Sequence, residues 1–579
     1  MEEKEYIHYE YKGKIDPVFI SKARKMFDKY KADKESLVKR IIDNDKWYRM
    51  RYAELMDEHT NATKPATAFI FSAIENKYAD AIDNFPVPNL LEREPSDQET
   101  AKILSKIIPA QLDMSGFKKV YKKNWRRKLK DGTGIYGVFY NEDREDIDIR
   151  PLGIMDVYCD MYLTDVQESQ FFFIAQAIDN AILKDAYPKY KDLFRGDADI
   201  QSYKGDSEKL EDKTEVIDCY YKKTDGTLHM IKLVGNNVIL ATEDMDGYEN
   251  GLYDHGMYPV IFDVLYPEED CPFGFGVVDV IKNPQMYVDK LDGIILKNAM
   301  LSGNPRTLMK NSSGINENEF KDYTNDIVHC TGDVGEQNIR TLTVDAIPQQ
   351  VMSHRDNKKN ELKEVVGNRD FQQGGTMGGV TAASAITSLQ QAGEKLSRAI
   401  IDDSYDVYKD LVIMVISLMR EFYTEERVYR ITNEMGSVEF KEFDSSMLMK
   451  PETDALGFPI DEYKRVEFDI GVIPQRENPF SKEANNQTIM NLWQSGFFLP
   501  QNLGVATVAL QCMNFDGKEK LMEQLREMNE QQQMAQQQQM MQQQMPQGGG
   551  DLIPVGQVGD SQIESEDDLV PVGQVGGEM

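Results

Sequence analysis

The sequence is poor in cysteine and in positive charge. Its 579 residues include only five cysteines, which are scattered and form no CxxC pair. Such a pattern is not typical of a disulfide framework or a zinc site, and it fits a reducing cytoplasm. Acidic residues outnumber basic residues by 98 to 66, which gives a formal net charge of −32. A free-standing nucleic-acid binder usually presents a basic face, because phosphate neutralisation drives its affinity. We therefore expect a soluble chain that repels nucleic acid over most of its surface.

Long hydrophobic runs are also missing. The longest strongly apolar run covers residues 411–419, and nine residues are too few to cross a bilayer, which takes about 20. The first five residues lack the basic and apolar regions of a secretory signal. The sequence therefore predicts no membrane segment and no leader, and we interpret the apolar run as part of a buried helix.

Nucleotide-binding motifs occur only in incomplete form. The glycines at 132, 134 and 137 match G-x-G-x-x-G, but a basic helix precedes them and a strand follows. Dinucleotide binding needs the opposite order, with the phosphate at a helix N-terminus, so we predict a simple helix-to-strand turn. Residues 374–381 resemble a phosphate-binding loop, but Val380 occupies the position of its lysine.

Catalytic and metal-binding constellations are absent from the sequence pattern. None of the six histidines has a second histidine or a cysteine at metal-ligand spacing, apart from the adjacent pair His329 and Cys330. Glu145, Asp146 and Asp148 cluster on a predicted strand, where alternation with isoleucines favours a solvated face. We therefore predict a protein that is not an enzyme and has no metal and no cofactor. A metal-dependent nuclease remains the alternative.

The helix predicted for residues 115–130 combines an apolar stripe with a basic surface. Phe117, Tyr121, Trp125 and Leu129 recur every four residues, and eight of the thirteen residues 118–130 are lysine or arginine. We interpret the stripe as core. The basic surface could touch phosphates, but in so acidic a chain we favour contact with an acidic neighbouring subunit.

The remaining chain divides into helical and strand-rich segments. Residues 66–84 form an amphipathic helix that Pro86 and Pro88 end, with another helix after them. Residues 133–265 and 427–473 have strand patterns. Between them the order is unusual. A helix starts at Asn283-Pro284, and a small insert and a second helix follow it. A segment with five glycines between residues 367 and 379 then leads to a third, long helix.

The C-terminal tail is of low complexity. Residues 531–545 are almost entirely glutamine and methionine, and the nine residues 551–559 recur with one change as 568–576. So little apolar surface predicts disorder. The duplicated stretch is either a linear binding motif or a duplication without function in a tail that tolerates sequence change.

The order of elements from 276 to 423 resembles the portal proteins of tailed bacteriophages. The segments ATAFIFSAIENKYADAIDNFPVPNLLE (66–92) and PQMYVDKLDGIILKNAMLSGNPRTL (284–308) resemble the N-terminal helix of that family and its first stem helix running into the clip. Residues 474–500 resemble the start of its crown. The resemblance covers about residues 40–520 and rests on the order of elements rather than on a single motif.

The resemblance implies an α+β fold with named parts. It predicts an α/β wing, a two-helix stem, a small α/β clip, a tunnel loop followed by a long kinked helix, and a helical crown. The expected boundaries are 1–275 and 424–477 (wing), 276–300 and 347–366 (stem), 301–346 (clip), 367–380 (tunnel loop), 381–423 (long helix), 478–530 (crown) and 531–579 (tail).

The same resemblance implies a structural role. Portal proteins of this kind form rings, usually of twelve subunits, at one capsid vertex, and double-stranded DNA passes through the channel. The implied partners are copies of the chain, the packaging terminase, a head-completion or tail adaptor, and the major capsid and scaffolding proteins. The implied location is the virion, after assembly in the host cytoplasm. A different ring-forming head–tail adaptor remains an alternative.

The candidate DNA-channel residues follow from these assignments. They lie on the second stem helix (Arg355, Lys358, Lys359, Lys363) and in the tunnel loop (Arg369, Gln372, Gln373, Thr376, Met377). Many phosphate contacts would hold DNA too tightly for it to move. A few basic rings in an otherwise acidic wall would make few such contacts and let DNA slide. Ordinary pairing within the helix is the alternative for the stem residues.

Overall fold

The structure is a computed structural model of the chain. It describes residues 11–51, 67–194, 196, 198–201, 207–210, 212–248, 251–303, 305–310, 314–322, 324, 326–332, 339–342, 345–366, 395–432, 438–453, 459–476, 490–491, 494–495 and 524. The chain separates into two compact units, Met1–Ser481 and Lys482–Met579. The first unit mixes helices and antiparallel sheets, which confirms the α+β class. Residues 367–394 and nearly all of the predicted crown and tail lie outside the described residues.

A five-stranded sheet packs against the first helix. The sheet has the order β10-β9-β8-β5-β4 and is built from β4 (Val157–Tyr158), β5 (Phe171–Asp179), β8 (Lys213–Lys222), β9 (Leu228–Val234) and β10 (Asn237–Ala241). Helix α1 (Pro17–Asp33) begins where the Asp16 carboxylate accepts a hydrogen bond from the Val18 amide. Its buried Phe27 makes edge-on ring contacts with Tyr158 and Phe173 of the sheet. Helix α2 (Glu35–Tyr48) follows, and α6 (Asn180–Ala186), β6 (Ala198–Gln201) and β7 (Ser207–Leu210) lie between β5 and β8.

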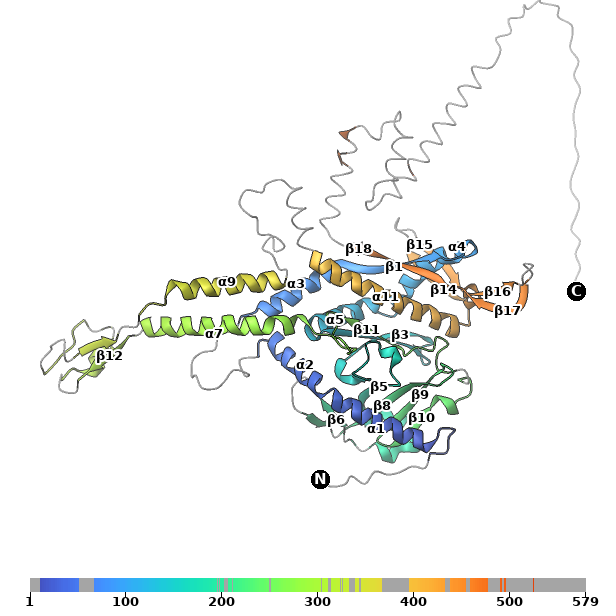
Figure 1. Ribbon diagram of the computed structural model, residues 1–579, viewed down its shortest axis with the longest axis horizontal. Helices are drawn as coiled ribbons and strands as arrows, with labels where there is room; N and C mark the ends of the chain where they lie inside the picture. Colours follow the sequence, from blue (N-terminus) through green and yellow to red (C-terminus); the bar gives the residue numbers. More distant parts are fainter. Residues whose placement is uncertain are drawn as a thin grey trace, which may run out of the picture. The chain divides into compact units, whose positions relative to one another are not determined.

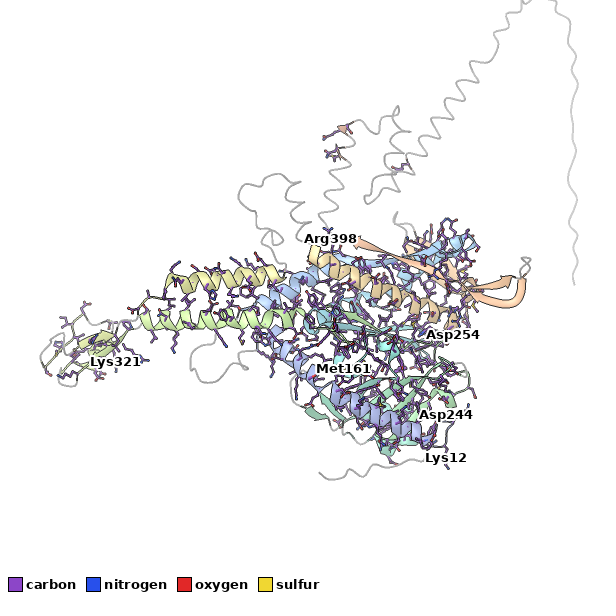
Figure 2. All side chains as sticks on the ribbon, in the orientation of Figure 1. Lys12, Met161, Asp244, Asp254, Lys321 and Arg398 are labelled. Carbon is purple, nitrogen blue, oxygen red and sulfur yellow. The ribbon has the colours of Figure 1, made fainter. Side chains whose placement is uncertain are left out.

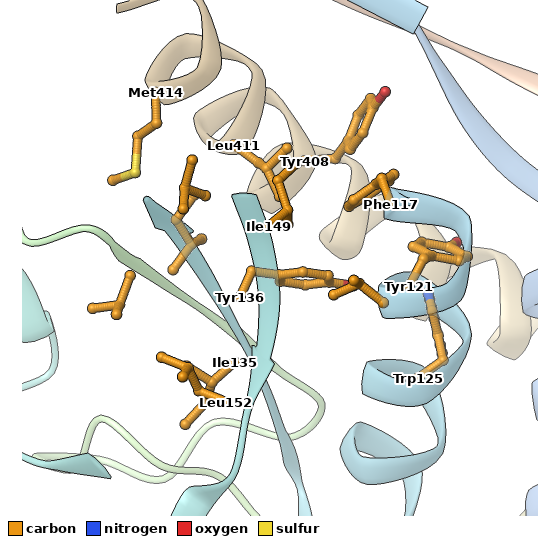
Figure 3. Close-up of a cluster of buried hydrophobic side chains, with 14 of the residues drawn as sticks. Phe117, Tyr121, Trp125, Ile135, Tyr136, Ile149, Leu152, Tyr408, Leu411 and Met414 are labelled. Carbon is orange, nitrogen blue, oxygen red and sulfur yellow. The ribbon is translucent and has the colours of Figure 1, made fainter. Parts of the chain in front are cut away.

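A second, three-stranded sheet carries the largest core. Its order is β11-β2-β3, with β2 (Thr133–Asn141), β3 (Asp146–Leu152) and β11 (Val260–Val264). Two helices, α5 (Phe117–Asp131) and α11 (Lys395–Phe422), pack against it, and Figure 3 shows Tyr136 of β2 pointing toward α5. The Phe117 ring of α5 contacts the rings of Tyr136 on β2 and Tyr408 on α11, and so joins the three elements.

Several predictions from the pattern are confirmed here. Phe117, Tyr121, Trp125 and Leu129 are all buried, as the stripe on the basic helix requires. The apolar run of residues 411–419 lies inside α11, with most of its side chains in the same core. No helix within the described ranges is long and apolar enough to cross a membrane.

The glycine motif forms the expected turn. Gly132 ends α5 with φ of 94°, and β2 starts at the next residue. A Cβ at Gly132 would lie 2.5 Å from the Gly274 carbonyl oxygen, so the close approach also requires glycine. The prediction for the carboxylates is confirmed in part. Ile147 and Ile149 are buried on β3, but Glu145 precedes the strand in a turn with φ of 50°.

The region after residue 84 differs from expectation. Pro86 and Pro88 end α3 (Phe69–Asp83), as predicted, but they lie in a strand, β1 (Asn84–Glu92), before α4 (Gln98–Met114) begins. This strand pairs antiparallel with β18 (Phe468–Arg476), almost 400 residues away in sequence. The nitrogens of residues 86, 88 and 90 point to the same edge, and the Leu90 amide donates to Ser105 Oγ of α4 rather than to β18. Both prolines therefore occupy positions where no ladder hydrogen bond is lost.

Helices α7 (Val277–Gly303) and α9 (Gln349–Val366) form a long hairpin, which Figure 1 shows side by side with β12 beyond their ends. The predicted helix start at Asn283-Pro284 is wrong, because α7 begins at Val277 and contains Pro284. The buried residues Val277, Val278 and Ile281 draw the first turns into the core, and the Asp279 carboxylate accepts from the Gly276 amide. The free energy gained by burying these side chains outweighs the loss of the backbone hydrogen bond that Pro284 cannot donate.

Short elements complete the described structure. Between the hairpin helices lie β12 (Arg306–Met309), α8 (Glu317–Lys321) and β13 (Ile339–Leu342), and β12 pairs with β13. The predicted strands after the long helix are present as the hairpins β14 (Arg427–Thr432) with β15 (Val438–Phe443) and β16 (Met449–Thr453) with β17 (Pro459–Arg465), followed by β18.

A buried ion pair joins three of these elements. Lys128 of α5 is fully buried, and its Nζ lies 2.6 Å from Asp263 Oδ1 of β11. Ser404 Oγ of α11 lies 3.1 Å and 3.2 Å from the two oxygens of the same carboxylate. Charges in so apolar a place are tolerated only when they are paired and hydrogen-bonded.

We expect Lys128→Met to lower the free energy of unfolding by about 3–5 kcal/mol, because it leaves Asp263 buried without its cation. The double variant Lys128→Met with Asp263→Leu should recover much of this loss, since no unpaired charge remains. Denaturant unfolding of both variants measures the difference. Lys39→Ala is the control, because it removes the exposed pair that Lys39 forms with Glu35 on α2. A double variant as unstable as the single one would show that the unpaired charge is not the cause.

Candidate functional site

The predicted DNA-channel residues of the second stem helix all lie on α9, where most of them have partners in the same chain. Arg355 Nε lies 2.8 Å from Asp292 Oδ1, and its Nη2 lies 3.3 Å from Asp292 Oδ2, so the guanidinium grips one carboxylate of α7 with two bonds. The hydrogen bonds that Arg355 donates to the Asp292 carboxylate raise the pKa of Arg355. This residue joins the two helices of the hairpin.

Two of the lysines also have identified contacts. Lys358 Nζ lies 2.6 Å from Glu361 Oε2, one turn along the same helix. Lys359 Nζ lies 5.7 Å from the centroid of the Phe69 ring of α3. Lys363 lies on the same helix and is half-buried. Arg355 thus pairs with Asp292 of α7 and with the adjacent Asp356, Lys358 pairs with Glu361 of its own helix, and Lys359 lies near the Phe69 ring.

The five predicted tunnel-loop residues, Arg369, Gln372, Gln373, Thr376 and Met377, lie outside the described residues. The same holds for the segment that resembles a phosphate-binding loop. Among the residues that are described, no group of three or more histidine, cysteine, aspartate or glutamate side chains could hold a metal ion.

The hairpin differs from the rest of the chain in charge. Helices α7 and α9 together carry seven lysines and arginines against six aspartates and glutamates, in a chain of net charge −32. An anionic polymer passing along this surface would meet a nearly neutral wall, with neither strong attraction nor strong repulsion.

The root of the hairpin is fixed by buried polar groups that the sequence analysis missed. Gln285 Oε1 accepts from the Ile70 amide at 3.0 Å, and its Nε2 donates to the Thr67 carbonyl at 2.8 Å. Asp289 Oδ1 accepts from the amide and the hydroxyl of Thr67 at 3.1 Å and 2.8 Å. Both side chains are buried on α7. The signal was available, because residues 281, 285, 288 and 289 share the inner face of one helix.

The distal part of the hairpin is bare. Val280, Tyr287 and Ile294 recur every seven residues, which places them in one stripe that runs along α7 from its root to its distal turns, and they are 39%, 45% and 57% exposed. On the distal turns Leu296 and Met300 are exposed as well. Beyond Asp289 no described side chain of α7 is buried, although Leu291, Ile294 and Ile295 follow. Figure 2 shows side chains projecting from both helices away from the contact between them. Exposed apolar surface of this extent is typical of an interaction site.

The insert at the end of the hairpin has the same character. Leu308 and Leu342 on the paired strands and Phe320 on α8 are exposed, as are Ile327 and Val328. Its described parts hold together through the β12–β13 ladder, the bridge between Ile315 and Cys330, and the contact of His329 with Glu319 at 2.9 Å.

Comparison with known proteins identifies the family. The sequence model described as phage P22-like portal protein matches residues 77–260 and 270–551, which is most of the chain. No curated protein matches the sequence significantly. The chain therefore belongs to the P22-like portal protein family of bacteriophages, as the order of its elements indicated. Portal proteins of this family are generally structural and sit at the capsid vertex of the virion.

We expect Arg355→Ala to loosen the hairpin, because it removes the bidentate contact between α9 and α7. Ion pairs that are partly exposed contribute up to about 1 kcal/mol. Losing that amount raises the equilibrium constant for local opening of the helix about fivefold. Hydrogen exchange of the α9 amides should rise accordingly. Lys358→Ala is the matched control, because its partner Glu361 lies on the same helix. Equal exchange in the two variants would contradict a cross-helix role for Arg355.

Proposed function

We propose that this member of the P22-like portal family forms a closed ring around a DNA channel at one capsid vertex. In this proposal α7 and α9 are the stem, the insert between them is the clip, residues 367–380 are the tunnel loop, and the sheets with their helices are the wing. The ring serves procapsid assembly, genome packaging, genome retention and ejection. Its partners are the terminase, a head-completion or tail adaptor, and the major capsid and scaffolding proteins.

The observation that supports this proposal most directly is the exposed apolar surface of the hairpin. Its root is buried and hydrogen-bonded, but its distal half presents an apolar stripe that nothing else in the first unit covers within the described residues. When one face of a subunit contacts a different face of the next, each subunit is rotated relative to its neighbour. Such contacts form a closed ring if these rotations add up to a full turn. Copies of the hairpin placed side by side around an axis would bury the stripe and enclose a central space.

The charge of the hairpin fits a conduit. A wall with many free basic groups would hold DNA in a strongly salt-dependent complex, whereas paired cations on a nearly neutral surface leave it free to move. We assign Arg355, Lys358, Lys359 and Lys363 to the stem part of the channel on this basis. Arg369, Gln372, Gln373, Thr376 and Met377 complete it in the tunnel loop.

We expect the purified protein to form rings with a central hole in negative-stain micrographs, and Ile294→Glu with Met300→Glu to reduce them to smaller species. Both side chains are exposed in the single chain, so the charges should leave its fold intact. Val18→Glu with Ile182→Glu is the control, because it places the same charges on exposed positions far from the hairpin. A chain that stays monomeric at high concentration, or rings that survive in the hairpin variant, would contradict the proposal.

Deletion of residues 370–378 should leave the rings intact but impair DNA packaging and retention. The reason is that the glycine-rich segment can change conformation easily enough to follow a moving DNA helix. Packaged DNA per particle, measured as nuclease-resistant DNA, reports the effect. Normal packaging and retention by the deletion variant would rule out the assigned role of this loop.

A further inference from the structure

A largely apolar groove lies along the open edge of strand β11. In the order β11-β2-β3, β11 has β2 on one side and no strand of the described chain on the other. The groove has a volume of about 410 Å³, and it is lined by β11, helix α11 and the segment 164–167. Its apolar lining includes Met257, Phe262, Pro272, Ile413 and Met414. The groove thus follows the side of β11 that the second sheet leaves uncovered.

The backbone of β11 directs hydrogen-bonding groups toward this open edge. In an antiparallel pair, alternate residues turn both their N–H and their C=O group to the partner strand. The Leu265 amide donates to the Gly132 carbonyl in the β11–β2 register, so the odd-numbered residues of β11 face β2. Phe262 and Val264 therefore turn their main-chain groups to the open edge, where no described residue pairs with them.

The side chain of Gln167 already pairs with the start of this edge. Its Oε1 accepts from the Tyr258 amide at 2.8 Å, and its Nε2 lies 3.1 Å from the Tyr258 carbonyl oxygen and 3.3 Å from that of Val260. Lys222 Nζ holds the same residue by donating to its main-chain carbonyl at 2.8 Å. A glutamine amide offers the donor and acceptor of one peptide group. The edge thus binds an amide at its start and continues beyond it with free main-chain groups.

Two carboxylates give the groove a preference for positive charge. Asp165 and Asp410 both line it, and Asp410 lies one turn before Ile413 on α11. Partial burial, together with the nearby carboxylates of Asp406 and Asp165, raises the pKa of Asp410. The adjacent Lys409 pairs with Asp406 at 2.7 Å, and no described cation forms an ion pair with Asp410. A cation bound in the groove would favour the ionised form of this carboxyl group.

We propose that the groove binds an extended segment of a partner protein, which adds to β11 as a further strand and carries a lysine or arginine close to apolar residues. Main-chain hydrogen bonds to Phe262 and Val264 would fix its backbone, and side-chain contacts would give specificity. Every second side chain of a strand points to the same side. A cation and an apolar residue two positions apart would therefore reach Asp410 and Ile413 together.

The open edge and its charge favour this occupant over others. A helix satisfies its own main-chain groups and would leave those of β11 unpaired. DNA would be repelled by the two carboxylates. Strand edges can also pair between copies, but a second copy of a chain with net charge −32 complements the groove less well than a basic segment does. The proposal does not depend on the ring.

Fluorescence anisotropy of a labelled synthetic peptide, acetyl-Thr-Lys-Thr-Val-Thr-Val-Thr-amide, titrated with the full-length protein tests the proposal. The lysine and the valines of this peptide share one side of a strand. We expect saturable binding, which should weaken about tenfold when glutamate replaces the lysine, because the ion pair with Asp410 becomes a repulsion. Absence of saturable binding, or equal binding of the two peptides, would overturn the proposal.

Variants of the protein locate the charge that the peptide recognises. Asp410→Asn should weaken binding of the lysine peptide about three- to tenfold, because it removes the carboxylate at the groove. Asp402→Asn is the matched control, since it removes an exposed carboxylate of the same helix that does not line the groove. Equal weakening by the two variants would indicate a general attraction to an acidic chain and would overturn the proposal.

Hydrogen exchange reports whether the peptide adds as a strand. Saturating peptide should slow exchange of the Phe262 and Val264 amides, which face the open edge. The Asp263 amide faces β2, so its exchange should not change. Binding that protects neither edge amide would contradict strand addition.

Comparison with the hairpin variant Ile294→Glu with Met300→Glu separates this groove from the ring. We expect equal peptide affinity for wild-type rings and for the smaller species of the variant. Binding by the variant alone would show that a second copy covers the edge in the ring, and a partner protein would then be excluded. Micrographs report ring formation independently of peptide binding, so failure of the groove and failure of the ring are distinguishable.

Discussion

Two helices that lie side by side can bury only the faces that they turn to each other. The hairpin of α7 and α9 is subject to this constraint over its distal half, where Ile294 and Met300 stay exposed in the single chain. Such a surface is stable in water only when further elements cover it. In the proposed ring, copies of the same hairpin supply those elements, and the assignment of a channel depends on this packing.

The body of the protein holds the hairpin at a fixed place. Gln285 and Asp289 saturate backbone groups of the segment before α3, so the root of α7 cannot slide without leaving buried polar groups unpaired. Behind this root, Lys128 and Asp263 connect α5 to the second sheet, and Ser404 adds α11 to the same contact. The result is a rigid base with a projecting, incompletely covered arm.

Charge is distributed unevenly between these parts. The arm is almost neutral, and Arg355, the cation that spans its two helices, is paired with Asp292. Six lysines and arginines of α5 line a cleft instead, together with Tyr48 of α2 and Tyr78 of α3.

The sequence by itself determined the helices with regular apolar stripes, the core role of residues such as Trp125 and Leu129, and the order of elements that marks the family. These follow from local periodicity, which each segment carries alone. The tertiary structure decided what depends on distant partners. Pro86 and Pro88 lie in a strand because β18 pairs with the other edge, and α7 starts before Asn283 because the core draws in Val277 and Val278. It also decided that Arg355 pairs with Asp292 and that Lys119, Lys122 and Lys123 line a cleft, because pairing and concavity are set by neighbours that lie close in space but far apart in the chain.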